Sequence, residues 1–175
     1  MKNNHLFLKT ISAFAFTSIL LLLVYYIGAV YPFGDHALLK WDMELQYADF
    51  FHWWHRVLHG KASMTYSLSK SLGDNAIGLT AYYLSSPFNL LLYFTDNIPL
   101  FISIVTILKL ASASLTSSLF LFYRFQNMKY IWNLLLSISY GLMGYNLCQA
   151  SNIMWLDGVI WLPILMLGIW KLLSE

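Results

Sequence analysis

The sequence predicts an all-α transmembrane protein, a multi-span helical bundle whose large external first loop contains an amphipathic interfacial helix. Of its 175 residues, 59% are hydrophobic and only 10% are charged, against about 25% charged in ordinary soluble domains. The apolar residues also gather in runs close to the roughly 20 that a helix needs to cross a bilayer core. Such a chain cannot cover itself with a wettable surface, so we expect a membrane protein.

Four apolar runs predict about four spans, all within one membrane domain that occupies residues 1–175. The spans are expected at residues 11–30, 98–122, 130–147 and 154–173. The first run is too long for a cleaved signal peptide and lacks a small-x-small cleavage site, so we expect an uncleaved anchor.

The stretch AYYLSSPFNLLLYF, residues 81–94, is apolar, but its sequence does not favour a fifth span. It carries Ser85, Ser86 and Pro87 at its centre, and helix is disfavoured before a proline. We expect a re-entrant or interfacial segment that is buried against protein.

The positive charges predict the orientation of the spans. Arg124 and Lys129 lie in the short connection after the second span, whereas the connection between the third and fourth spans holds no Lys or Arg. Positive residues in short loops stay on the cytoplasmic side. Both termini are therefore expected in the cytoplasm, and residues 31–97 form one external loop.

Residues 41–59 of this loop have helical periodicity. The apolar positions that recur at three- and four-residue steps are Tyr47, Phe50, Phe51, Trp54 and Leu58. The opposite face is polar, so the sequence predicts an amphipathic helix that lies on the membrane. A simple account is that its tryptophans anchor it in the interface while its polar face meets water.

Acidic residues of the loop are candidates for chemistry. Asp35 follows the first span directly and Asp42 begins the predicted helix. Two carboxylates held near the headgroup plane could act as general bases on a lipid-borne substrate. Helix capping alone would also explain Asp42.

Three motifs in order, YPFGDHALLKWDMELQY, KSLGDNAIGLTAYYLSSPFNLL and NIMWLDGVIWLPILMLGI, resemble the N-terminal part of the YfhO family of bacterial multispanning membrane proteins. The resemblance covers essentially the whole chain. It implies a protein of the bacterial cytoplasmic membrane that is similar to GT-C glycosyltransferases, which transfer a sugar from a polyprenyl-phosphate carrier to a cell-surface glycopolymer such as teichoic acid.

The resemblance also implies roles for individual residues. Asp35 and Asp42 correspond to the base or substrate-orienting aspartate of the first external loop, and Asp157 of the WLDG motif to a second acid. Family members are much longer, so we expect a fragment, a truncated gene product or one half of a split enzyme, with the missing C-terminal part as a partner. The alternative is a non-enzymatic membrane subunit or flippase-like component that binds a lipid-linked headgroup.

Other residues complete the expected site. The candidate substrate-binding residues, among them the loop's cations that could neutralise a departing lipid phosphate, are Lys40, Gln46, Arg56 and Lys70. Lys109 falls near the middle of the second span and is expected to pair with an acid or a carbonyl of a neighbouring helix. The small residues around it, residues 111–118, should allow close helix packing.

The sequence argues against several other partners and cofactors. No basic run could track a phosphodiester backbone, so nucleic acid is not expected. His52–His55 and His55–His59 have helical metal-ligand spacing but no fixed carboxylate partner, so we expect neither a metal nor another cofactor. Cys148 is the lone cysteine and is assigned a packing role.

Overall fold

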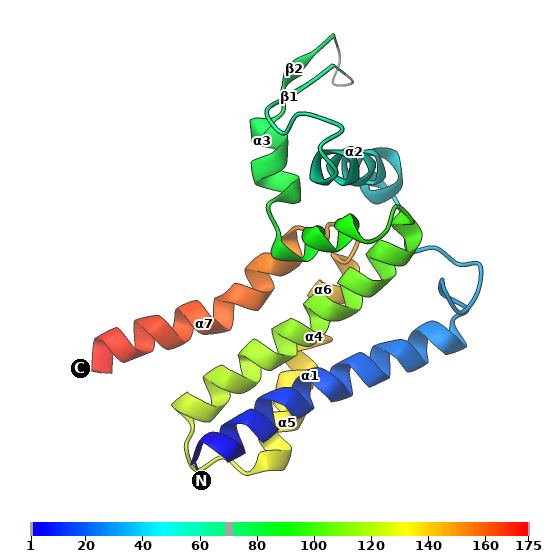
Figure 1. Cartoon of the computed structure of the whole chain (residues 1–175). Helices are drawn as coiled ribbons and strands as arrows, with labels where there is room; N and C mark the ends of the chain where they lie inside the picture. Colours follow the sequence, from blue (N-terminus) through cyan, green and yellow to red (C-terminus); the bar gives the residue numbers. More distant parts are fainter. Residues whose placement is uncertain (1, 69–71, 175) are drawn as a thin grey trace.

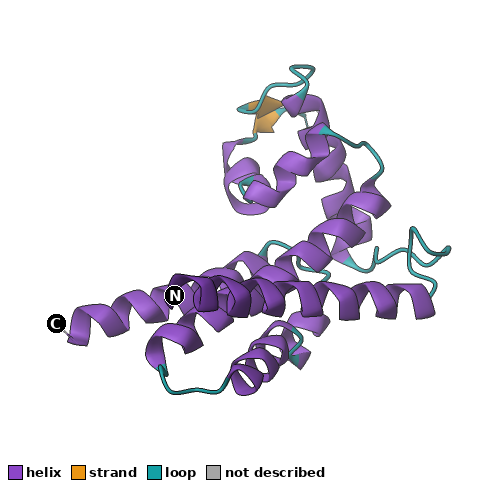
Figure 2. Cartoon of the chain, turned by 60° about the horizontal axis from the view of Figure 1, so that its bottom comes forward, coloured by secondary structure: helices purple, strands orange, loops and turns teal. Residues whose placement is uncertain are grey.

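The computed structural model describes residues 2–68 and 72–174, and they are mostly helical (Figures 1 and 2). Three long helices, α1 (Lys2–Ile27), α4 (Ile98–Arg124) and α7 (Trp155–Ser174), form the body of the molecule. Helix α4 is central, because it packs against both α1 and α7. The N-terminus lies at the same end of the body as the C-terminal end of α4 (Figure 1).

These three helices are long and apolar enough to cross a membrane, over Thr10–Ile27, Ile98–Arg124 and Trp155–Ser174. The predicted helical spans 11–30, 98–122 and 154–173 are therefore confirmed as membrane-span candidates. The start of α4 has clear local causes, because the Asn97 side chain accepts a hydrogen bond from the Leu100 backbone N–H at 3.0 Å and Pro99 occupies the first turn.

Residues 130–147, expected to be a single span, form two helices instead. Helix α5 (Tyr130–Gly141) and helix α6 (Gly144–Cys148) are separated by an extended Met143. The 12 residues of α5 extend about 18 Å at 1.5 Å per residue, short of a bilayer core of about 30 Å. The two pieces return the chain from the far end of α4 to the start of α7 (Figure 1).

The break has a physical cause that the hydropathy pattern does not reveal. The Asn146 side-chain amide donates hydrogen bonds to the carbonyl oxygens of Tyr140 and Gly141, at 2.9 and 3.0 Å. These carbonyls stand at the C-terminal end of α5, where no further turn of helix satisfies them. A single buried side chain therefore stabilises the interruption.

Small residues let the helices pack closely, as the sequence predicts. Thr17 of α1 donates a hydrogen bond to Ser114 of α4 at 2.8 Å, and Ser118 donates to Asn133 of α5 at 2.6 Å. Gly141 lies against α4 so closely that an added Cβ would come within 2.8 Å of the Leu110 carbonyl oxygen. This contact requires glycine.

The connection between α1 and α4 contains a second folded part, residues 43–68 and 72–84, which lies above the N-terminal end of α4 (Figure 1). It begins with a π-helical segment (Met43–Tyr47) that runs into α2 (Ala48–Leu58), so the predicted helix at 41–59 is confirmed. A short antiparallel hairpin follows, in which β1 (Tyr66–Ser67) pairs with β2 (Asp74–Asn75). Helix α3 (Ile77–Leu79) then leads back towards α4.

The aromatic face of α2 does not lie free for lipid, which corrects the prediction of a purely interfacial helix. Phe51 is 1% exposed and its ring stands 5.0 Å, centroid to centroid, from that of Phe101 in α4. The same hydrophobic cluster includes Trp54, Leu84 and Leu92. An apolar helix face has the same periodicity whether lipid or protein covers it, so the sequence alone could not distinguish these two cases.

Residues 81–94 do not form a single helix. A π-helical segment (Thr80–Leu84) and a 3-10 helix (Pro87–Tyr93) meet at Ser85 and Ser86, where the backbone becomes extended before Pro87. The break predicted before the proline is confirmed. Leu84, Asn89 and Leu92 are buried in the protein, as expected of a segment that packs against protein.

Candidate functional site

A buried ion pair joins α4 to the first turn of α7. Lys109 Nζ lies 2.9 Å from Asp157 Oδ2, and the exposed fractions of the two side chains are 1% and 24%. Lys109 Nζ also donates a hydrogen bond to the Ile153 carbonyl oxygen at 2.9 Å. The expectation that Lys109 pairs with an acid of a neighbouring helix is confirmed, and the carbonyl that it also contacts lies in the turn just before α7.

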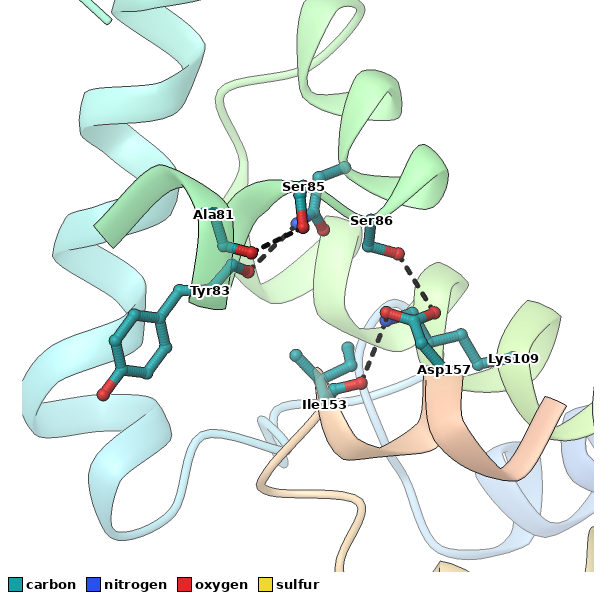
Figure 3. Close-up of polar contacts among 8 residues, drawn as sticks. Ala81, Tyr83, Ser85, Ser86, Lys109, Ile153 and Asp157 are labelled. Carbon is teal, nitrogen blue, oxygen red and sulfur yellow. Dashed lines mark hydrogen bonds and ion pairs between the residues drawn. The ribbon is translucent and has the colours of Figure 1, made fainter. Parts of the chain in front are cut away.

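The ion pair also holds the segment before α4. Ser86 Oγ donates a hydrogen bond to Asp157 Oδ1 at 3.1 Å (Figure 3). The Phe88 ring centroid lies 5.7 Å from Lys109 Nζ. Asp157 therefore connects three elements: α4, α7 and the turn that opens the 3-10 helix. Both oxygens of its carboxylate have partners, which fixes the orientation of the side chain.

A second polar cluster lies where the π-helical segment meets the connection before α7. Tyr47, which is buried, donates its hydroxyl to Asn152 Oδ1 at 3.1 Å, and Asn152 Nδ2 donates to Gln149 Oε1 at 2.9 Å. Burial raises the pKa of the Tyr47 hydroxyl, and the negative charge of the neighbouring Asp42 raises it further. The hydroxyl therefore remains protonated near neutral pH and acts as a hydrogen-bond donor.

The two clusters meet at consecutive residues. Asn152 receives the hydrogen bond from Tyr47, and Ile153 receives the one from Lys109. A continuous set of contacts therefore runs from the first turn of the loop helix, beside Asp42, to Asp157 at the start of α7. Asp157 belongs to this polar junction and Asp42 lies beside its other end, although 115 positions separate the two acids.

Asp35 does not join this junction. Its side chain is exposed, and it takes no part in any hydrogen bond or ion pair within residues 2–68 and 72–174. The neighbouring His36 does have a structural role, because its ring Nδ1 hydrogen-bonds to the Gly28 carbonyl oxygen at 2.9 Å. That contact holds the turn after α1 against the helix end.

The predicted substrate-binding residues occupy separate places. Lys40 lines a cavity of about 230 Å³ together with Trp41, Thr106 and Ser151. Arg56 lines a different cavity, of about 380 Å³. Gln46 is exposed, and Lys70 falls outside the described residues. The structure does not bring the side chains of Lys40, Gln46 and Arg56 together around one point.

Two histidines at the C-terminal end of α2, His55 within it and His59 directly after it, bond to the backbone. The His55 ring hydrogen-bonds to the Leu92 carbonyl oxygen at 2.6 Å, and the His59 ring to the His55 carbonyl oxygen at 2.8 Å. Among residues 2–68 and 72–174, the structure contains no group of three or more His, Cys, Asp or Glu residues that could hold a metal ion. Cys148 is exposed rather than packed in the core, which corrects the packing role expected for it.

Tyr47, Ser86 and Asn152 are members of the junction that sequence reasoning missed. The periodicity places Tyr47 on the apolar face of the helix, yet a buried tyrosine hydroxyl usually needs a hydrogen-bond partner. This requirement predicts a polar partner for Tyr47, and in the structure that partner is the Asn152 side chain. No comparable signal marks Ser86.

Comparison with models of known protein families identifies the family of the chain. A protein-family model described as "Bacterial membrane protein YfhO" matches residues 12–175. The matched region includes Asp42, Lys109 and Asp157, and hence the whole polar junction. Neither a curated protein nor a solved structure matches the chain.

Proposed function

Because the chain belongs to the YfhO family of bacterial membrane proteins, we propose that it takes part in sugar transfer at the membrane surface. The proposed donor is a sugar on a polyprenyl-phosphate carrier, and the proposed acceptor is a cell-surface glycopolymer such as teichoic acid. The observation that carries the proposal is the polar junction, where an exposed loop acid, Asp42, stands beside a hydrogen-bonded network that reaches Asp157.

The proposal includes a topology with both termini in the cytoplasm and residues 31–97 outside. In this topology α5 and α6 together make a broken crossing between α4 and α7, which gives four crossings in total. The positions of Arg124 and Lys129 support it, since Arg124 ends α4 and Lys129 directly precedes α5, so both flank the short connection between the two helices. Irregular backbone at membrane depth is tolerated where protein covers it.

We assign the general base to Asp42. The acceptor hydroxyl oxygen would attack the anomeric carbon while the bond from that carbon to the carrier phosphate breaks. The electron pair stays on the phosphate oxygen, and the hydroxyl proton goes to the Asp42 carboxylate. Asp42 suits this role because it is exposed and can meet substrate. Asp35 is the second candidate for the base.

Asp157 and Lys40 would have supporting roles. Because the Asp157 carboxylate is already bound to Lys109 and Ser86, we assign it to positioning the start of α7 rather than to taking a proton. Lys40 lines a cavity with Trp41, and its ammonium group could neutralise the departing phosphate of the carrier.

The test compares transfer rates of purified protein in proteoliposomes. Asp42→Asn should lower the rate about 10²- to 10⁴-fold, the usual cost of removing a general base, while expression stays near normal. Asp96→Asn is the matched control, because Asp96 is an exposed acid of the same connection. Equal rates for the two variants would refute the assignment of Asp42.

A non-enzymatic subunit that binds a lipid-linked headgroup is the second candidate. The cavity that Lys40 shares with Trp41, Thr106 and Ser151 favours it, because a cation, an aromatic ring and hydroxyls suit a phosphorylated headgroup. A subunit of this kind would bind the donor but turn over none of it, and Asp42→Asn would change neither property.

A further inference from the structure

A separate cavity of about 380 Å³ lies between α2 and the segment that carries the hairpin. Asp49, His52, Trp53 and Arg56 line it from α2, and Ser67 of β1 lines it from the hairpin. Its volume falls within the range of about 300 to 1,000 Å³ that is typical of small-molecule sites. The acids that the proposed function uses do not line this cavity; they are Asp35, Asp42 and Asp157.

One face of α2 supplies the chemistry of the cavity. Asp49, Trp53 and Arg56 follow one another at spacings of four and three residues, so they share a face of the helix. Asp49 and Arg56 are exposed. Trp53 is half-buried and packs against the hydrophobic cluster, with its ring centroid 6.3 Å from that of Trp54. The cavity thus combines a supported aromatic ring with a carboxylate and a guanidinium that are open to solvent.

These groups match a ring-shaped ligand with one apolar face and hydroxyls at its edge. An aromatic face packs against an apolar ring face, a carboxylate accepts hydrogen bonds from hydroxyls, and a guanidinium donates them. The charges of Asp49 and Arg56 cancel, so the lining favours a neutral ligand over an anion. We propose that this cavity binds a neutral hexopyranose unit of a glycan, with Asp49 and Arg56 on its hydroxyls and Trp53 against its ring.

The further assignment of this sugar to the glycan acceptor rests on the proposed function. The binding of a hexopyranose to the cavity does not rest on the proposed function, because it requires only the residues that line the cavity. The two statements can therefore fail separately in one set of measurements.

The experiment measures binding by calorimetry, with the full chain purified in detergent. The probes are the methyl glycosides of glucose and of N-acetylglucosamine, with mannitol as an open-chain polyol and glycerol 3-phosphate as an anion. We expect at least one glycoside to bind more tightly than mannitol and glycerol 3-phosphate. Asp49→Asn and Arg56→Gln should each weaken that glycoside about 10- to 100-fold, as loss of a hydrogen bond to a charged group implies.

Two further variants separate ring contact from folding. Trp53→Phe should keep most of the affinity, whereas Trp53→Leu should lose it, while both variants still show one cooperative thermal unfolding transition. Glu44→Gln is the control, since Glu44 is an exposed acid on the preceding turn that does not line the cavity.

The outcomes separate clearly. Glycoside binding without sugar transfer would sustain this inference and defeat the proposed function. Sugar transfer with no glycoside binding, tighter binding of mannitol or glycerol 3-phosphate, or equal affinity in Asp49→Asn and Glu44→Gln would overturn the inference.

Discussion

Breaking the ion pair between Lys109 and Asp157 from one side should strongly destabilise the protein, and a single substitution tests this. In Asp157→Asn the Lys109 ammonium keeps its bond to the Ile153 carbonyl but loses its counter-charge. Because the Lys109 side chain is 1% exposed, water cannot replace the carboxylate. Breaking a buried pair from one side typically costs about 3 to 5 kcal/mol, and we expect that loss in the free energy of unfolding.

A double variant measures how much of that loss comes from the stranded charge. Lys109→Met with Asp157→Leu removes both charges and fills the space with apolar side chains. Replacing a whole buried pair in this way is often close to neutral. The double variant should therefore be more stable than either Asp157→Asn or Lys109→Met alone.

The assay is equilibrium unfolding in mixed micelles, followed by tryptophan fluorescence, with Asp96→Asn as the control. If Asp157→Asn unfolds within about 0.5 kcal/mol of the control, the range of ordinary surface substitutions, then the pair does not stabilise the fold. A double variant that is less stable than both single variants would show that Ser86 or another partner carries the energy instead.

Three other predictions address packing and topology. Gly141→Ala should destabilise the protein by about 1 to 3 kcal/mol in the same unfolding assay, because its Cβ would collide with α4; wild-type stability would show that α5 does not pack this closely. Phe51→Ala should lower the free energy of unfolding by about 3 to 5 kcal/mol. Gln46→Ala, at an exposed position of the preceding turn, should change it by no more than about 0.5 kcal/mol. Equal protease sensitivity of the two variants would argue against a buried aromatic face. In a Cys148→Ser background, a cysteine at Asn127 should not react with an impermeant thiol reagent in intact cells. Labelling from outside would show that the connection after α4 is external and would contradict the proposed topology.

The sequence predicted those features that depend on local pattern. Hydropathy located α1, α4 and α7, and the proline after Ser86 predicted the break within residues 81–94. The cost of a charge in a span predicted a partner for Lys109. Each of these rests on a property of a single segment or residue.

The remaining features depend on contacts between distant segments. The break after α5 rests on the Asn146 amide, which bonds to carbonyls five and six positions earlier. The burial of the α2 aromatic face requires the apolar surface that Phe101 of α4 provides. The bond from Tyr47 to Asn152 spans 105 positions. Periodicity reports that a face is apolar but does not report what covers it.

Donor binding and donor turnover, measured on the same proteoliposomes, test the proposed function most directly. The account predicts that the wild-type protein consumes a polyprenyl-phosphate sugar only when the glycopolymer acceptor is present. It also predicts that Asp42→Asn keeps the donor affinity within about twofold while its turnover falls at least about 100-fold. A wild-type protein that binds the donor and never consumes it, or an Asp42→Asn variant that turns over at the wild-type rate, would contradict the account.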